Sequence, residues 1–139
     1  MNPANPNGNF RVYYQNVNGI TSGKGTGKWN KINEFMHDNN IAIYRLTKTN
    51  VEWNKQKMTA CLKPAVQRQF NHATISTSTS TMQFQENYKP GGTCTVAVKQ
   101  WSGRTLMTIT NTTGQGQWSG IKIRGHRQNV VIVTAYSIR

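Results

Sequence analysis

Residues 10–20 read FRVYYQNVNGI, and residues 41–50 read IAIYRLTKTN. Each stretch begins as an apolar, strand-like run and breaks into polar residues where a strand would leave a sheet. In layered α/β folds, polar groups that bind or react gather at such strand ends, because loops there carry polar side chains without burying them. The two stretches therefore predict one polar rim, with Asn16 at the end of the first strand and residues 47–50 at the end of the second.

The segment between these strands predicts the crossover that makes them neighbours. Apolar side chains recur at helical spacing and predict an amphipathic helix over 28–39, with a core face of Trp29, Ile32, Phe35 and Met36. A strand, a helix and a strand within this length form a crossover unit, which sets the strands 10–17 and 41–46 parallel.

The rest of the chain predicts one more helix and several antiparallel strands. Residues 53–70 have a helical apolar face, with Pro64 kinking or restarting the helix. The Ser/Thr-rich stretch 74–81 fits an edge strand or a loop equally well. Alternation from residue 91 onward predicts strands at 93–99, 105–110, 117–124 and 130–136, with turns at 101–103 and 124–129. The apolar run Val130–Val133 predicts a central strand buried on both faces.

These elements predict a mixed α/β fold with a single domain over residues 10–139, preceded by a disordered arm over residues 1–9. The N-terminus has no apolar signal core, and no run reaches transmembrane length. We therefore expect a soluble intracellular protein, nuclear or cytoplasmic, with no membrane partner. Cys61 and Cys94 show no metal-ligand spacing, and in an intracellular protein we expect them to be buried thiols. A disulfide between them is the alternative.

The charge of the chain is strongly unbalanced. Seventeen Lys and Arg residues face four acids, Glu34, Asp38, Glu52 and Glu86, which gives a net charge of +13. Such an excess favours polyanionic partners, and nucleic acid is the natural one, because phosphate neutralisation supplies most of non-specific binding. The basic glycine-rich segment 21–28, TSGKGTGK, does not match the phosphate-loop pattern, since Ser22 stands where its first Gly belongs.

In the order and spacing of its motifs the chain resembles the endonuclease/exonuclease/phosphatase superfamily, and within it the retroelement and transposon type. The motifs that carry the resemblance are residues 15–20, 41–53, 88–93, 116–118 and 132–136. The resemblance implies a four-layered α/β sandwich of two packed sheets. It also implies descent from enzymes that cleave phosphodiester bonds with a divalent metal, usually Mg²⁺.

The resemblance is partial at the residues that would bind the metal. Asn16 matches the Asn that touches metal or phosphate in the family, and Tyr136 ends the Tyr-bearing strand. The turn that supplies a metal-binding Glu reads Lys48-Thr49-Asn50 here, and Ala42 stands where an Asp often precedes that strand. The later Gly-Asp-x-Asn and Ser-Asp-His motifs would lie beyond Arg139, so about the N-terminal half of the family domain is expected. We therefore expect no metal or other cofactor, with Asn16 a vestigial catalytic residue.

These observations favour a nucleic-acid-binding, catalytically inactive form of a metal-dependent phosphodiesterase domain. The contacts would be to phosphates of DNA or RNA, through Lys24, Lys28, Arg45, Lys48, Asn50, Arg124 and Arg127. One alternative is an active Mg²⁺-dependent endonuclease completed by a longer chain or a partner, and a second is a structural basic protein of a nucleoprotein assembly. A sheet without its later strands would also favour self-association, or a partner that covers it. His37 on the helix is expected at the surface, and His126 lies in a basic turn.

Overall fold

The computed structural model describes residues 10–20, 27–51, 53, 56–79, 91–111 and 117–136, and residues 56–61 by their backbone alone. Residues 1–9, predicted as a disordered arm, lie outside the described part. The elements in chain order are β1 (Val12–Asn16), α1 (Gly27–Asp38), β2 (Ile43–Thr47), α2 (Gln56–Phe70), β3 (Ala73–Ser78), β4 (Thr93–Val98), α3 (Gln100–Gly103), β5 (Thr105–Thr110), β6 (Trp118–Ile123) and β7 (Val130–Ala135). None of the described helices is long and apolar enough to cross a membrane.

The strand–helix–strand unit at the N-terminus is confirmed. β1 and β2 are parallel neighbours, with Val12 opposite Ile43 and Asn16 opposite Thr47, and α1 lies between them in sequence. Both strands therefore end at the same edge of the sheet.

The core face of α1 differs from the prediction at one position. Trp29, Ile32 and Met36 are buried, but Phe35 is 42% exposed and Asn33 is buried instead. Asn33 is tolerated because its Nδ2 donates to the Trp29 carbonyl and its Oδ1 accepts from the Tyr44 hydroxyl. Phe35 lies at the margin of the core, its ring centroid 5.4 Å from that of Tyr13.

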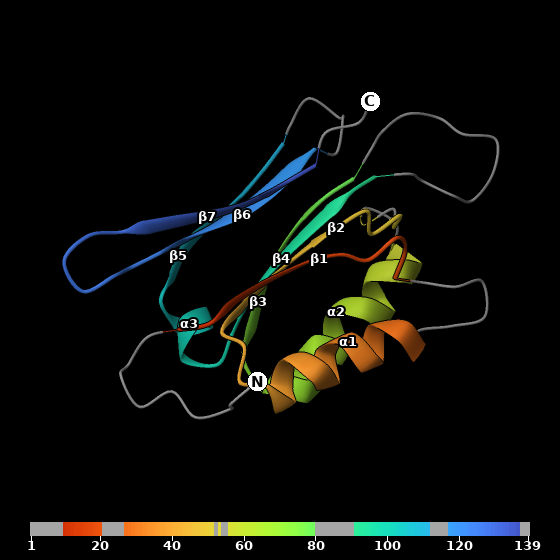
Figure 1. The fold of residues 1–139 in the computed structure, drawn as a ribbon, viewed down its shortest axis with the longest axis horizontal. Coiled ribbons are helices and arrows are strands. Elements are labelled where there is room, and N and C mark those ends of the chain that lie inside the picture. The colour runs from red at the N-terminus through yellow and green to blue at the C-terminus, as the bar shows by residue number, and fades with distance from the viewer. Residues whose placement is uncertain are drawn as a thin grey trace.

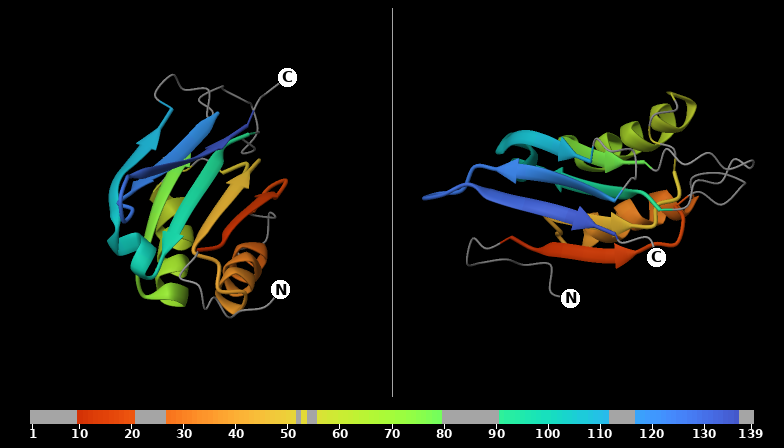
Figure 2. Two further views of the ribbon diagram at one scale, coloured as in Figure 1. Left: turned by 60° about the vertical axis from the view of Figure 1, so that its left-hand side comes forward. Right: turned by 90° about the horizontal axis from the view of Figure 1, so that it is seen from above.

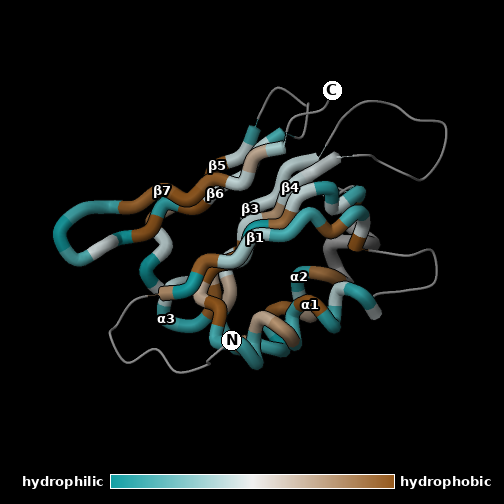
Figure 3. Tube along the Cα trace, viewed as in Figure 1, coloured by the Kyte–Doolittle hydropathy of each residue, from teal (hydrophilic) through white to brown (hydrophobic). Residues whose placement is uncertain are grey.

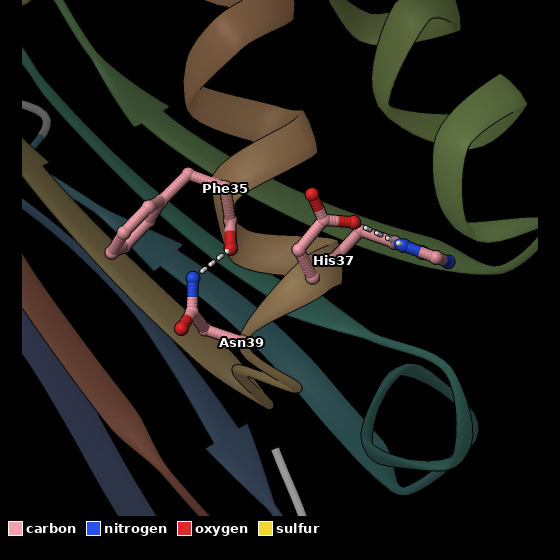
Figure 4. A network of polar contacts seen from close by, with 4 residues as sticks. Phe35, His37 and Asn39 are labelled. Carbon is pink, nitrogen blue, oxygen red and sulfur yellow. Dashed lines mark hydrogen bonds and ion pairs between the residues drawn. The ribbon is translucent and has the colours of Figure 1, made fainter. Parts of the chain in front are cut away.

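Side chains at and just beyond the C-terminal end of α1 make polar contacts there. Asn39 Nδ2 donates to the Phe35 carbonyl at 2.9 Å, and the imidazole of His37 pairs with Asp38 at 3.4 Å (Figure 4). Asn40 follows with a φ of 52°, a left-handed conformation that Asn tolerates better than most residues. His37 is exposed, as expected.

The first sheet has the strand order β1-β2-β4-β3 and carries α1 and α2 on one face (Figure 1). The core between the helices and this sheet is large and apolar. It contains Trp29, Met36, Tyr44, Leu46, Leu62, Val66, Cys94, Val96 and Val98. α2 is a single helix that contains Pro64, so the proline does not divide it. Residues 74–78 of the Ser/Thr-rich stretch belong to β3, an edge strand of this sheet, and residues 80–81 lie outside the described part.

The second sheet has the order β5-β6-β7, and all its strand pairs are antiparallel. The predicted β6–β7 pairing across residues 124–129 is confirmed. β5 does not return along β4, because the short helix α3 carries the chain from the first sheet to the second. The two sheets face each other, with α1 and α2 on the far side of the first sheet (Figure 2).

The prediction that Val130–Val133 is a central strand buried on both faces is wrong. β7 is an edge strand, and its side chains are substantially exposed, at 36% for Val130, 52% for Val131 and 39% for Val133. Its local composition is that of a buried strand, but among the described residues nothing covers its outer face or its free edge.

Cys94 is a free, fully buried cysteine on β4, as predicted, while the side chain of Cys61 lies outside the described part. Burial raises the pKa of the Cys94 thiol to about 12, with nearby Lys63 acting weakly in the opposite direction. Burial also raises the pKa of Tyr44 well above its ordinary value.

We expect Cys94 to make the protein sensitive to alkali. In the unfolded chain the thiol loses its proton near its ordinary pKa of about 8.5, whereas in the folded chain it keeps it to about pH 12. Between these values the free energy of unfolding should fall by up to about 1.4 kcal/mol per pH unit. Urea unfolding of the wild type and of Cys94→Ala at rising pH measures this fall in stability. Because both proteins contain Tyr44, its ionisation contributes to both pH profiles. Parallel pH profiles for the two proteins would contradict it.

Candidate functional site

The predicted polar rim is present, and three segments build it. Beyond the ends of β1 and β2, Gly19 N donates to the Lys48 carbonyl at 2.6 Å, and Ile20 N to that of Thr49 at 3.1 Å. The segment before β4 joins them, because Asn50 N donates to the Gly91 carbonyl at 2.9 Å. We call residues 16–20, 47–51 and 91–93 the rim.

The backbone of the rim is unusually rich in left-handed residues. Positive φ angles occur at Asn18 (48°), Gly19 (89°), Lys48 (54°), Asn50 (53°), Gly91 (90°) and Gly92 (84°). Asn and Gly adopt this region readily, but a lysine there is uncommon and costs conformational energy. Side chains support two of these turns, since Asn16 Oδ1 accepts from Asn18 N at 3.3 Å and Asn50 Oδ1 from Gly91 N at 3.0 Å. Strain of this kind is more often found at functional sites than elsewhere.

Lys48 is the cation that the rim presents. Its side chain is partly exposed, and its ammonium lies 5.8 Å from the ring centroid of Tyr136, at the end of β7. The ammonium thus stands where the ends of the two sheets meet. Lys28 points to the same region from α1, but its Nζ donates to the Val17 carbonyl. Asn16 is exposed beside them.

The described rim contains no carboxylate. Of the four acids in the chain, Glu34 and Asp38 lie on α1, away from the rim, and Glu52 and Glu86 lie outside the described residues. Within the described part no cluster of His, Cys, Asp and Glu that could hold a metal is found. Mg²⁺ prefers hard carboxylate oxygens, and an ammonium repels it, so the residues described here do not fit a Mg²⁺ site.

Arg45 does not belong to the rim. It lies in the middle of β2, with its side chain on the face turned toward the second sheet and its guanidinium 5.5 Å from the ring centroid of Tyr14. Its Nε is buried and has no hydrogen-bond partner among the described residues. A buried donor left in this way carries a desolvation cost that a ligand would relieve.

The other predicted phosphate contacts are spread over the molecule. Arg124 and Arg127 lie in the turn between β6 and β7, at the far end of the second sheet from the rim (Figure 1). Both are exposed, as is His126 between them. Lys24 lies outside the described residues. The side-chain oxygen of Asn50 accepts a hydrogen bond from Gly91 N, and this contact holds residues 91–93 of the rim.

A cluster of buried hydroxyl groups lies beneath the rim, between the sheets, and the sequence did not predict it. Ser78 and Thr93 bond at 2.6 Å, Thr93 donates to Ser119 at 2.7 Å, and Thr95 bonds Thr134 at 2.7 Å. The sequence signal for this cluster is the frequent Ser and Thr in β3 and β4, a pattern that looks like a low-complexity segment. These neutral groups satisfy one another, so they join the sheets and supply no base or metal ligand.

Searches among protein families and curated proteins find no match to this chain. Comparison with solved structures finds an endonuclease/exonuclease/phosphatase family protein from Leptotrichia buccalis, with a TM-score of 0.66 and 10% sequence identity. The similarity covers 92% of this chain and 55% of that one. The chain has the fold of this family.

The expected endonuclease/exonuclease/phosphatase fold is thereby confirmed, and the chain spans about half the length of the solved protein it matches. The described part corresponds to two facing sheets with helices on one outer side. At 10% identity the similarity concerns the fold alone.

Proposed function

We propose that this protein binds nucleic acid through its phosphates and does not cleave it. It would be a catalytically inactive form of the endonuclease/exonuclease/phosphatase fold, of the retroelement type that its motifs resemble. The observation that carries the proposal is Lys48, a lysine held in a left-handed conformation at the rim, with no carboxylate among the described residues around it. In the family resemblance this is the position of a metal-binding Glu.

The charges favour an anionic ligand at the rim. Replacing a carboxylate by an ammonium at one position changes the local charge by two units, against a metal cation and in favour of a phosphate. A lysine binds phosphate as a point charge on a flexible stem, which suits contacts that carry no sequence information. The net charge of +13 adds long-range attraction for any polynucleotide, DNA or RNA.

The remaining basic residues have different roles in this proposal. Lys28, whose ammonium lies at the Val17 carbonyl, and Lys24 would extend the rim contact. Arg124 and Arg127 would form a separate contact at the opposite end of the second sheet, so a duplex would touch the protein at more than one place. Asn16 and Asn50 offer amide groups at the rim, while their side-chain oxygens also support its turns.

We expect no hydrolysis of DNA or RNA in Mg²⁺ or Mn²⁺, because the described rim has neither carboxylate ligands nor a general base for water. Conversion of supercoiled plasmid to the nicked form is a sensitive assay. Asn16→Ala is the control, since it removes the amide that the family places on the metal or phosphate. Metal-dependent nicking that disappears in Asn16→Ala would show that the rim is an active site and would refute this proposal.

A further inference from the structure

A tryptophan and two arginines come together around α3, at the end of the sheets away from the rim. The guanidinium of Arg104, the residue after α3, lies 5.2 Å from the ring centroid of Trp101. Arg124 N donates to the Arg104 carbonyl at 2.9 Å, one position beyond the Thr105–Ile123 pair of β5 and β6. Both arginines are exposed, and the chain is hydrophilic around α3 and along the β6–β7 turn (Figure 3). We call Trp101, Arg104 and Arg124 the α3 patch.

The indole of Trp101 is held in place from several sides. It packs against the apolar cluster between the sheets that contains Ile43 and Ile123, and its ring centroid is 4.6 Å from that of Phe10. Thr105 Oγ1 also donates to the Trp101 carbonyl at 3.2 Å. The side chain is still partly exposed. An aromatic ring that is ordered before a ligand arrives lowers the entropic cost of binding.

The described residues do not neutralise the charge of this patch. Residues 91–139 contain no Asp or Glu. The two acids in the described part, Glu34 and Asp38, lie on α1, which covers the outer face of the first sheet. Like charges at opposite positions of an antiparallel pair repel each other and destabilise the sheet. Arg104 and Arg124, adjacent across β5 and β6, therefore favour an anion that both can contact.

We propose that the α3 patch binds an unpaired stretch of nucleic acid, with one base stacked on Arg104 and a neighbouring phosphate at Arg124. The planar guanidinium would lie between the indole of Trp101 and the base, since this group stacks on aromatic rings and bases stack on it. A duplex offers phosphates but keeps its bases stacked on one another, so it gains only the charge contact here. The inference rests on the proposed function, to which it adds a second site and the form of nucleic acid bound there.

The first test compares two oligonucleotides, one of about eight deoxythymidines and one of the same length with stable abasic residues in their place. The two carry the same phosphates, so a difference in affinity measures the contact with the bases. In fluorescence anisotropy the intact strand should bind the full chain at least about tenfold more tightly. Equal affinities would mean that charge alone holds the strand and would overturn the proposal.

Arg104→Lys tests where the base lies. Lysine keeps the positive charge but has no planar group to stack. Because Arg104 is exposed, the change leaves the core intact. The variant should bind the intact and abasic strands with nearly equal affinity, while its affinity for a duplex should stay within about twofold of that of the wild type.

The matched control is Arg68→Lys, the same change at an exposed arginine on α2. It should keep the preference for the intact strand, at least about tenfold. An Arg104→Lys protein that also keeps this preference would place the bases elsewhere and would overturn the proposal.

The duplex measured alongside separates the α3 patch from the rim. Lys48→Glu should weaken duplex binding and leave the preference for intact over abasic strands unchanged. If the wild type fails to bind a duplex but keeps this preference, the proposal for the rim fails and the α3 patch stands. If the duplex binds as expected and the preference is absent, the α3 patch alone is refuted.

Discussion

Lys48→Glu is expected to weaken the binding of duplex DNA by roughly ten- to a hundredfold at low salt. The change removes a charge-assisted contact, worth about 1.5–3 kcal/mol, and places a carboxylate against the phosphate. Fluorescence anisotropy with a labelled duplex measures it. The effect should be large because the Lys48 ammonium stands where the ends of the two sheets meet, 5.8 Å from the ring of Tyr136.

The matched control is Lys99→Glu, which makes the same change in charge at an exposed lysine just beyond β4, at the end of the first sheet away from the rim. It should lose only the affinity that any surface charge reversal costs. Since Lys48→Glu partly restores the ligand that the family resemblance places there, added Mg²⁺ should recover some of the loss. Equal losses in the two variants, with no recovery in Mg²⁺, would make Lys48 an ordinary surface lysine.

Gly92→Ala is expected to destabilise the fold by at least about 2 kcal/mol, the largest effect on stability that we predict from the rim. Gly92 has a φ of +84°, and a Cβ there would lie 2.8 Å from Thr49 Oγ1 and 3.0 Å from the Ser78 carbonyl oxygen. An alanine therefore meets both backbone strain and a collision with the segments that flank it. Because those segments hold Lys48 and Asn50 in place, DNA binding should weaken as well.

Urea unfolding measures the stability of this variant. Gly103→Ala is the control, since a Cβ there meets no atom within 4 Å and the residue has no positive φ. It should change the free energy of unfolding by less than about 1 kcal/mol. A Gly92→Ala protein as stable as Gly103→Ala would show that the third segment of the rim is not held as described.

The N-terminal unit could be predicted because its signals are local. The apolar periodicity of residues 10–17, 28–39 and 41–46 determines one helix between two strands, and connection rules make the strands parallel. The rim follows from that geometry alone. Phe35 was misassigned because its spacing fits the core face, whereas Asn33 is buried through bonds to Trp29 and Tyr44 that sequence spacing does not reveal.

What depends on the order and register of the sheets could not be predicted. Val130–Val133 has the composition of a central strand, and only the partners of β7 show that it is an edge. Arg45 and Lys48 are three residues apart, but one lies within a strand and faces the second sheet, while the other follows its end. Arg124 and Arg127 lie far from the rim because β6 runs from the rim toward the opposite end, a direction that no local pattern determines.

The central claim is that the protein binds nucleic acid by neutralising phosphates, and the salt dependence of affinity tests it most directly. Binding of two duplexes of unrelated sequence should be equal and should weaken linearly on a log–log plot, with a slope of about −0.9 per phosphate contacted. With contacts at the rim and at the Arg124–Arg127 turn, we expect a slope of about −2 or steeper. No binding at about 50 mM salt, or an affinity that salt leaves unchanged, would contradict the account.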